Sequence, residues 1–467
     1  MAEVGRGGPA PSCACRQLVF ADKKSKDLPL TSLGEQKTIL AALVNFLASA
    51  DEACAGLGIS LTSSGNDTFT KIAELSLFPA DNGSTLCKRI HPSRARVLPK
   101  CHTPQTGLTI RSFSHFLALV PSTEVCPDWF SFCAETNEHA LNLLLVPWPT
   151  DVVPRQFRAT ETQKISDEVG RGGYGLFTFD GQRRARAGMI RDLLSLAEET
   201  VGRIDGVVFP ELALAPAAVR QISRAVVKED RFLITGVGES ARKGICGQNH
   251  IRFDVMLPGG EYLAQLEQKK RHRWKLEKNQ IVQYGIGSAL HPLANWWEHF
   301  DITDRQLIFV TLKPWLTICV LLCEDLARPD PLGDLVRSVG PNLVVCLLMD
   351  GPQLSGRWPG RYATVLAGDP GCSVLTFTSA GMAKLSRSQM GTTGRSNCIA
   401  LWKDARTGVA KEITMAPSDD AIVLSIAVEY CEEWSAEGRG DEGNAGHPYP
   451  QIDRAKEECW SEDADRN

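Results

Sequence analysis

Apolar runs alternate with amphipathic segments along residues 139–431 of this sequence. Runs such as 139–149 and 316–323 have the length and the residue types of buried strands. Between such runs, segments 183–203 and 217–230 carry apolar residues at the spacing of an amphipathic helix. Because strands that alternate with helices build sheets covered by helices, this pattern predicts an α/β domain over residues 139–431.

Residues 31–135 show a different pattern from the rest of the chain. Residues 32–59 and 110–120 have apolar positions at helical spacing. The basic stretch 88–100 between them contains prolines, and a solvated loop explains it better than a nucleic-acid surface does. We therefore predict a mainly helical accessory domain over residues 31–135, preceded by a flexible N-terminus over residues 1–30.

The final segment, residues 432–467, is acidic and rich in glycine, and it has few aliphatic residues. Such a composition cannot bury enough apolar surface to offset the conformational entropy that is lost on ordering. We predict a flexible acidic tail in this segment.

The overall composition is that of a soluble globular protein, with 43% hydrophobic and 23% charged residues. A formal net charge of -4 gives no overall attraction to nucleic acid or to anionic membranes. No segment approaches the roughly 20 uninterrupted apolar residues that a spanning helix needs. The first residues also lack the apolar core of a signal peptide. We expect a cytoplasmic protein with no membrane contact.

The chain contains 15 cysteines, and their positions argue against a disulfide framework. Their number is odd, and several, such as Cys319 and Cys346, lie inside apolar runs. Free cysteine behaves as a small core hydrophobe, and a reducing compartment keeps thiols unpaired. Cys13 and Cys15 lack a second pair of ligands at zinc-binding spacing. We therefore expect free thiols, no bound metal and no cofactor.

Three local patterns carry candidate chemistry, and each follows an apolar strand. Glu211 comes after a strand and a proline, which suits a carboxylate that acts as a general base. Lys269 and Lys270 end a second strand, where a lysine can stabilise a developing oxyanion. Cys323 leaves a third strand at a turn, where a sulfur can face a pocket and attack a substrate. Taken one at a time, a surface glutamate, a solvated cationic run and a buried thiol explain these patterns equally well or better.

The turn after Cys323 is polar and therefore poorly suited to burial. Glu324 and Asp325 follow the cysteine directly, and the backbone N–H groups there can face an oxyanion. Asp325 and Arg328 are expected to fix the turn through an ion pair.

The order Glu211, Lys270, Cys323, each residue at a strand end of one α/β domain, resembles the nitrilase superfamily of carbon–nitrogen hydrolases. The run from Cys323 to Pro329 is similar to the family's Cys-x-Asp-x-x-x-Pro turn, and Lys270 with His272 is similar to its Lys-x-His. The resemblance covers roughly residues 139–431. It implies a four-layer αββα sandwich in addition to the N-terminal helical region and the tail.

The resemblance also implies roles for the residues. Cys323 would attack the carbon of a small amide, nitrile or carbamoyl substrate and form a thioester, and Glu211 would take the thiol proton and later activate water. Lys270 and the backbone N–H of Glu324 would hold the oxyanion. Many relatives orient their lysine with a second glutamate, for which Glu277 is the nearest candidate.

The choice between Lys269 and Lys270 stays open at this point. Neighbouring residues on a strand face opposite sides of the sheet, so only one of the two lysines can point into the site. The Lys-x-His match favours Lys270.

Three functions are compatible with this sequence to different degrees. The first is an amidase- or nitrilase-type hydrolase, with a homodimer formed through the helix at 330–340. The second is a binding or signalling module of the same fold in a bacterial phage-defence system with a reverse transcriptase partner, as the resemblance to large bacterial proteins of that kind implies. A papain-like protease is disfavoured, because His447 is the only histidine after Cys323 and it lies in the predicted tail.

Overall fold

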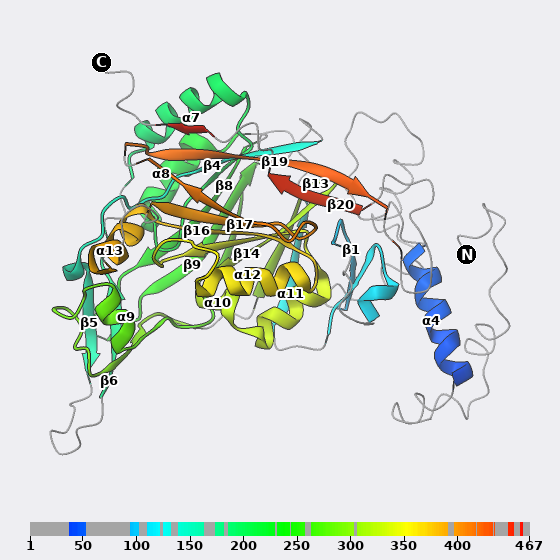
Figure 1. The fold of residues 1–467 in the computed structure, drawn as a ribbon, viewed down its shortest axis with the longest axis horizontal. Helices are drawn as coiled ribbons and strands as arrows, with labels where there is room; N and C mark the ends of the chain where they lie inside the picture. Colours follow the sequence, from blue (N-terminus) through cyan, green and yellow to red (C-terminus); the bar gives the residue numbers. More distant parts are fainter. Residues whose placement is uncertain are drawn as a thin grey trace.

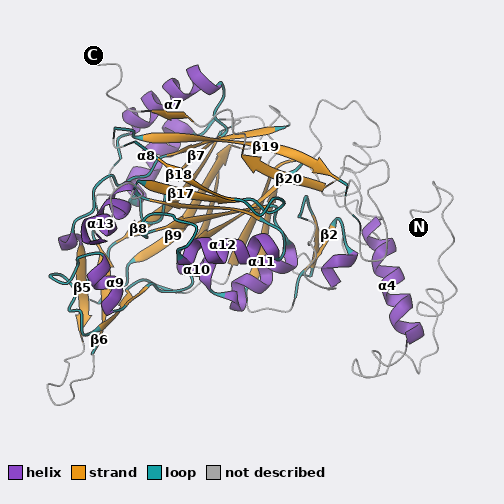
Figure 2. Ribbon diagram, in the orientation of Figure 1, coloured by secondary structure: helices purple, strands orange, loops and turns teal. Residues whose placement is uncertain are grey.

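The computed structural model describes most of the region for which the sequence predicts an α/β domain. The described residues are 37–52, 94–101, 110–121, 125–131, 139–162, 173–181, 185–228, 231–242, 244–256, 263–302, 306–390, 397–416, 418–432, 434, 447–452 and 458–460. Figure 1 shows the course of the chain, and Figure 2 shows its helices and strands by type. The predicted flexible N-terminus at residues 1–30 lies outside the described residues.

One large sheet has eight strands and mixes parallel and antiparallel pairs. Its order is β10-β9-β8-β7-β4-β19-β20, and β21 also pairs with β19. The neighbours β4, β7 and β8 are parallel, as expected for strands joined by helices. The strands are β4 (Ala140–Leu145), β7 (Gly206–Val208), β8 (Phe232–Glu239), β9 (Gln248–Met256), β10 (Leu263–Lys269), β19 (Ala421–Cys431), β20 (His447–Ile452) and β21 (Glu458–Trp460).

The second large sheet has seven strands in the order β18-β17-β16-β15-β14-β13-β3. Its central strands β14, β15 and β16 are parallel and buried along their whole length, which explains their continuous apolar sequence. The strands are β3 (Cys126–Ser131), β13 (Gln306–Lys313), β14 (Leu316–Leu322), β15 (Leu343–Leu348), β16 (Ser373–Thr378), β17 (Cys398–Lys403) and β18 (Ala410–Thr414). β17 and β18 form a hairpin, and Gly408 in its turn has a φ of 67°.

The two sheets pack face to face and are covered by helices on their outer faces. Side chains from the inner faces, such as Leu143 and Val320, form one apolar core. The helices α7 (Ala187–Val201) and α8 (Pro216–Val226) pack on the outer face of the eight-stranded sheet. On the other side, α11 (Asp334–Val339) and α12 (Trp358–Gly368) cover the seven-stranded sheet (Figure 1). This is the predicted four-layer αββα sandwich.

A smaller sheet lies beside the sandwich. Its strands come from residues that lie, along the chain, between the main strands and helices of the sandwich. Its order is β11-β12-β6-β5, and it forms a separate core with the helices α9 (Lys278–Gln283) and α13 (Ala380–Met390). Trp274 and Trp296 are buried in this core and serve packing. The strands are β5 (Phe157–Thr162), β6 (Tyr174–Phe179), β11 (Lys275–Leu276) and β12 (Asn295–Glu298).

The N-terminal region is less helical than predicted where it is described. Helix α4 (Lys37–Glu52) agrees with the predicted helix, but residues 110–120 form the short 3-10 helix η2 (Ile110–Phe113) and the strand β2 (Leu117–Leu119). Strand β2 pairs with β1 (Ala95–Val97), and β3 joins the seven-stranded sheet beside β13. The helical spacing of apolar residues misled the prediction at 110–120. A short pair of strands with one buried side can carry as many apolar residues as a helix of the same length. The extent of an accessory domain over the rest of residues 31–135 stays a prediction.

The predicted tail also contains ordered strands. In the described part of residues 432–467, β20 and β21 both pair antiparallel with β19. Tyr449 is 6% exposed, and the Pro450 carbonyl accepts a hydrogen bond from Ser373 Oγ at 3.0 Å. The prediction of a flexible tail was wrong at these strands. Without β20 and β21 one edge of β19 would be unpaired, and its backbone N–H and C=O groups bind these strands. The amino-acid composition does not reveal such pairing.

No helix among the described residues is long and apolar enough to span a membrane.

Candidate active site

The sandwich brings Glu211, Lys270 and Cys323 together from both large sheets. Glu211 follows β7, and Lys270 follows β10, both in the eight-stranded sheet. Cys323 follows β14 in the seven-stranded sheet and precedes the short helix α10 (Glu324–Ala327). All three residues are buried, with exposures of 2%, 1% and 1%. Three strand ends that are distant in sequence therefore form one cluster.

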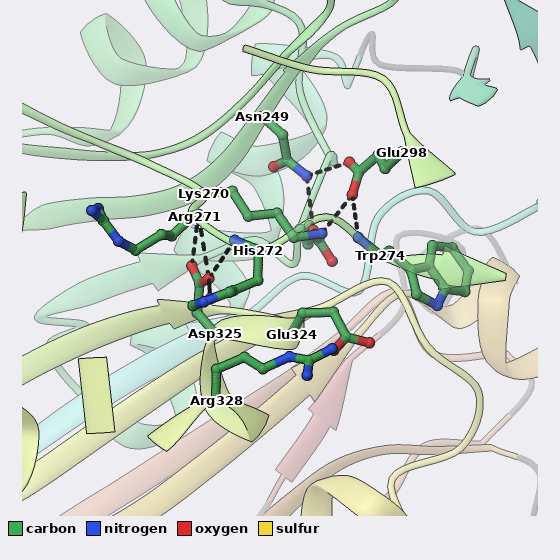
Figure 3. Close-up of polar contacts among 10 residues, drawn as sticks. Asn249, Lys270, Arg271, His272, Trp274, Glu298, Glu324, Asp325 and Arg328 are labelled. Atoms are coloured by element: carbon green, nitrogen blue, oxygen red, sulfur yellow. Dashed lines mark hydrogen bonds and ion pairs between the residues drawn. The ribbon is translucent and has the colours of Figure 1, made fainter. Parts of the chain in front are cut away.

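The ammonium group of Lys270 lies between two carboxylates (Figure 3). Its Nζ is 2.7 Å from Glu211 Oε1 and 2.6 Å from Glu298 Oε2, and its side chain is fully buried. Burial alone would lower the pKa of Lys270, but Glu211 and Glu298 together raise it well above its ordinary value. The lysine is therefore a fixed positive charge inside the protein.

The structure distinguishes Lys270 from its neighbour by the side of the strand that each residue faces. The Lys269 side chain is 36% exposed, and its Nζ lies 3.9 Å from Asp301 Oδ2 at the surface. Since successive side chains of a strand point to opposite faces, Lys269 turns outward where Lys270 turns inward. Of the two candidates, Lys270 is the one beside Glu211.

The second glutamate beside the lysine is Glu298 and not Glu277, the candidate named from the sequence. Glu277 precedes α9 and forms an ion pair with Lys275, and its side chain is 55% exposed. Glu298 ends β12 of the small sheet, far along the chain from Lys270. Distance along the sequence misled the choice, because β12 is placed by a sheet that the sequence pattern did not reveal.

Asn249 of β9 links the groups of this cluster and was not recognised from the sequence. Its Nδ2 donates to Glu211 Oε1 at 2.8 Å and to Glu298 Oε1 at 2.7 Å. Its backbone carbonyl accepts a hydrogen bond from the Lys270 backbone N–H at 2.9 Å. One residue thus fixes both carboxylates and the start of the lysine segment. Its strand carries several polar residues, so the sequence gives no signal that singles out Asn249.

Cys323 has an uncommon backbone conformation. Its φ is 42° and its ψ is −108°, which L-amino acids with a side chain rarely adopt. Its backbone N–H donates to the Leu347 carbonyl at 3.0 Å, which ties the turn to the neighbouring strand β15. Strain of this kind costs on the order of 1–3 kcal/mol and is found where a reactive side chain must be held in place.

Asp325 joins the cysteine turn to the lysine segment. Its Oδ1 accepts hydrogen bonds from the His272 backbone N–H at 2.9 Å and from His272 Nδ1 at 2.8 Å. The Arg271 backbone N–H donates to the same carboxylate at 3.3 Å. The expected ion pair between Asp325 and Arg328 is therefore absent. Arg328 lies instead 3.5 Å from Glu324 Oε2, with its side chain 52% exposed.

The electrostatics of the site keep the proton on the sulfur at rest and place Glu211 beside it as an acceptor. Burial raises the pKa of the Cys323 thiol well above its ordinary value, and the nearby Glu211 raises it further, against the effect of Lys270. Burial also raises the pKa of Glu211, although Lys270 and Asn249 counteract this. Glu211 Oε2 is buried and has no hydrogen-bond partner among the described residues. The resting sulfur is thus a neutral thiol, and one carboxylate oxygen is free to accept its proton.

The described residues contain no cluster of three or more side chains suited to hold a metal ion.

Neither a family model nor a curated protein matches this sequence. Among solved structures, Nit3 of Saccharomyces cerevisiae, described as a member of branch 10 of the nitrilase superfamily, matches with a TM-score of 0.35 and 11% identity over 62% of this chain and 90% of that one. A carbon–nitrogen hydrolase from Helicobacter pylori G27 matches with a TM-score of 0.36 and 12% identity over 62% and 89%. An amidase from Nesterenkonia sp. matches with a TM-score of 0.30 and 13% identity over 52% and 76%. The chain is similar to these nitrilase-superfamily, carbon–nitrogen hydrolase and amidase structures.

Proposed function

We propose that this protein is a thiol hydrolase of the nitrilase superfamily that cleaves a non-peptide carbon–nitrogen bond in a small amide, nitrile or carbamoyl compound. The observation that carries the proposal is the buried cluster in which Lys270 lies between Glu211 and Glu298, with Cys323 at a strained strand exit. A nucleophile, a base and a fixed positive charge are the groups that acyl transfer requires.

The proposed reaction on an amide has two halves. In the first, Glu211 accepts the thiol proton while Cys323 Sγ attacks the carbonyl carbon, and Lys270 with the Glu324 backbone N–H stabilises the oxyanion. The tetrahedral intermediate collapses to a thioester, and the leaving amine takes the proton from Glu211. In the second half, Glu211 removes a proton from water, which attacks the thioester carbon; the C–S bond breaks, Cys323 Sγ takes the proton back from Glu211, and the acid is released.

Glu298, Asn249 and Asp325 support these groups without taking part in bond changes. Glu298 and Asn249 hold the ammonium and the base at fixed distances. Asp325 holds the cysteine turn against the lysine segment. Such preorganisation lowers the reorganisation needed in the transition state.

The test is release of ammonia from a panel of small amides, nitriles and N-carbamoyl compounds. Cys323→Ala should abolish turnover, because no other group in the cluster can form the thioester. Cys319→Ala is the matched control, since Cys319 is a buried thiol of the preceding strand with no contact to Glu211 or Lys270 in the described part. Turnover that survives Cys323→Ala, or the absence of turnover for every compound, contradicts the proposal.

A second function is a binding or signalling module, which the almost complete burial of Cys323 and Lys270 favours. In this alternative the protein acts in a bacterial phage-defence system with a reverse transcriptase partner. A covalent adduct of an electrophilic amide probe on Cys323 without any turnover would favour this function over hydrolysis. The cytoplasmic location and the homodimer stay predictions, and size-exclusion chromatography with light scattering tests the latter.

A further inference from the structure

A cysteine–histidine pair lies outside the proposed active site. Cys246 Sγ is 3.5 Å from His299 Nε2, and His299 Nδ1 is 2.8 Å from Thr160 Oγ1. Cys246 is exposed to solvent, whereas His299 is only 6% exposed. The three residues come from three separate segments: the turn before β9, the end of β12 and strand β5. The Cys246 thiol, the His299 imidazole and the Thr160 hydroxyl group thus form a chain of two successive contacts.

The hydroxyl group of Thr160 decides which ring nitrogen of His299 carries the proton. Thr160 Oγ1 donates its single hydrogen to the Leu176 carbonyl at 3.2 Å. With its hydrogen placed on this carbonyl, the hydroxyl accepts a hydrogen bond from His299 at 2.8 Å, and the proton of the neutral imidazole is assigned to Nδ1. The lone pair of Nε2 then faces Cys246 Sγ. In this tautomer His299 is oriented to accept the thiol proton.

The backbone holds the pair in register. The Gly247 backbone N–H donates to the His299 carbonyl at 3.0 Å, and the Asp301 N–H donates to the Gly247 carbonyl at 3.2 Å. A Cβ atom at Gly247 would come within 2.6 Å of the Glu239 carbonyl oxygen and 2.9 Å of the His299 carbonyl oxygen. Only glycine permits this approach, so the segment that carries Cys246 is pressed against the segment that carries His299.

Solvent access separates Cys246 from most other thiols. Among the cysteines whose side chains the structure describes, only Cys126 is also exposed, and no histidine contact is seen for it within that part of the chain. Apart from Cys323 of the proposed active site, the other cysteines whose side chains the structure describes are buried or partly buried among apolar neighbours, where thiols react slowly. Cys246 is thus the described thiol that combines access with an oriented base.

We propose that Cys246 is a modification site that undergoes exchange with small disulfides, with His299 as its base. The Cys246 thiol proton passes to His299 Nε2, and the sulfur attacks one sulfur of the incoming disulfide. A new S–S bond forms to Cys246 as the old one breaks, and the leaving thiolate takes the proton from His299. The protein is left with a mixed disulfide and the co-reactant with one free thiol. This step does not depend on the proposed hydrolase function.

The test is to treat the full-length protein with oxidised glutathione at pH 7 and to follow each cysteine by peptide mass spectrometry. Cys126 serves as the internal control because it is also exposed to solvent. Cys246 should gain the mixed disulfide about tenfold faster than Cys126. Equal rates at the two thiols, or a faster rate at Cys126, would overturn the proposal without any variant being made.

Two variants test the base itself. His299→Gln should lower the rate at Cys246 to that at Cys126 and leave the Cys126 rate unchanged. Thr160→Val keeps the imidazole and the side-chain shape but removes the acceptor for Nδ1, so it should lower the Cys246 rate in the same direction. Circular dichroism confirms that each variant folds. A rate at Cys246 that is unchanged in a folded His299→Gln variant would mean that the imidazole is not the base.

Discussion

The contacts of Glu298 allow the effect of Glu298→Gln to be estimated. Its Oε2 accepts a hydrogen bond from Lys270 Nζ at 2.6 Å, and its Oε1 accepts one from Asn249 Nδ2 at 2.7 Å. A glutamine has one oxygen and one NH₂ in place of the two oxygens. Whichever way the amide is turned, its NH₂ faces a donor, either the ammonium or the Asn249 amide. Asn249 cannot turn over to compensate without losing its hydrogen bond to Glu211.

The free energy of unfolding should therefore fall by about 2–4 kcal/mol. Removing one partner of a buried ion pair costs about 3–5 kcal/mol, and a buried donor without an acceptor costs about 1–3 kcal/mol. The loss of stability in Glu298→Gln should lie toward the lower end of these two ranges. Lys270 keeps one ionic partner, because Glu211 stays 2.7 Å from Lys270 Nζ. The turnover number should fall about 100-fold, because a displaced ammonium no longer matches the oxyanion. The Michaelis constant should change little, since that contact strengthens only in the transition state.

Urea unfolding followed by tryptophan fluorescence measures the stability, and ammonia release on the best substrate of the panel measures the rate. Glu277→Gln is the matched control, because Glu277 makes an ion pair with Lys275 in which both side chains are more than one third exposed. Exposed pairs contribute about 0–1 kcal/mol, so this variant should unfold and react almost as the wild type does. If both variants lose activity equally, or if Glu298→Gln behaves as the wild type, Glu298 does not hold Lys270 in the way described here.

Three further predictions follow from the same site. Lys270→Ala should abolish turnover whereas Lys269→Ala should keep it, and the reverse result in the ammonia assay would show that the wrong lysine was chosen. Gly236→Ala should reduce the stability and turnover together, since its Cβ would lie 2.5 Å from Glu211 Cα, and a variant that melts and reacts like the wild type would contradict this contact. Because the folded-state pKa of Cys323 is raised, its alkylation by iodoacetamide should keep rising with pH between about 7 and 9, and a plateau below about pH 8 would show a thiolate at rest.

The apolar pattern predicted the layered fold, because buried strands and the helices that cover them leave strong signals. The continuous apolar runs of β14 and β15 are buried on both faces, and no other element produces such runs at that length. The same reasoning failed where a strand is short or depends on a partner. Residues 447–452 gave no strand signal, because their order depends on backbone pairing with the edge of β19.

Glu211, Lys270 and Cys323 could be named from the sequence because each follows a predicted strand and because their order, with the Lys-x-His and Cys-x-Asp-x-x-x-Pro patterns, resembles the nitrilase superfamily. The partners of these residues could not be named in this way. Glu298 and Asn249 reach Lys270 from β12 and β9, and Asp325 turns away from Arg328 toward His272. The register and packing of strands distant in sequence set these contacts. The sequence by itself therefore indicated the candidate reactive groups and the layers that carry them. Only the tertiary structure decided which charges face one another, because hydrogen bonds and ion pairs depend on distances of a few ångströms that chain order does not encode.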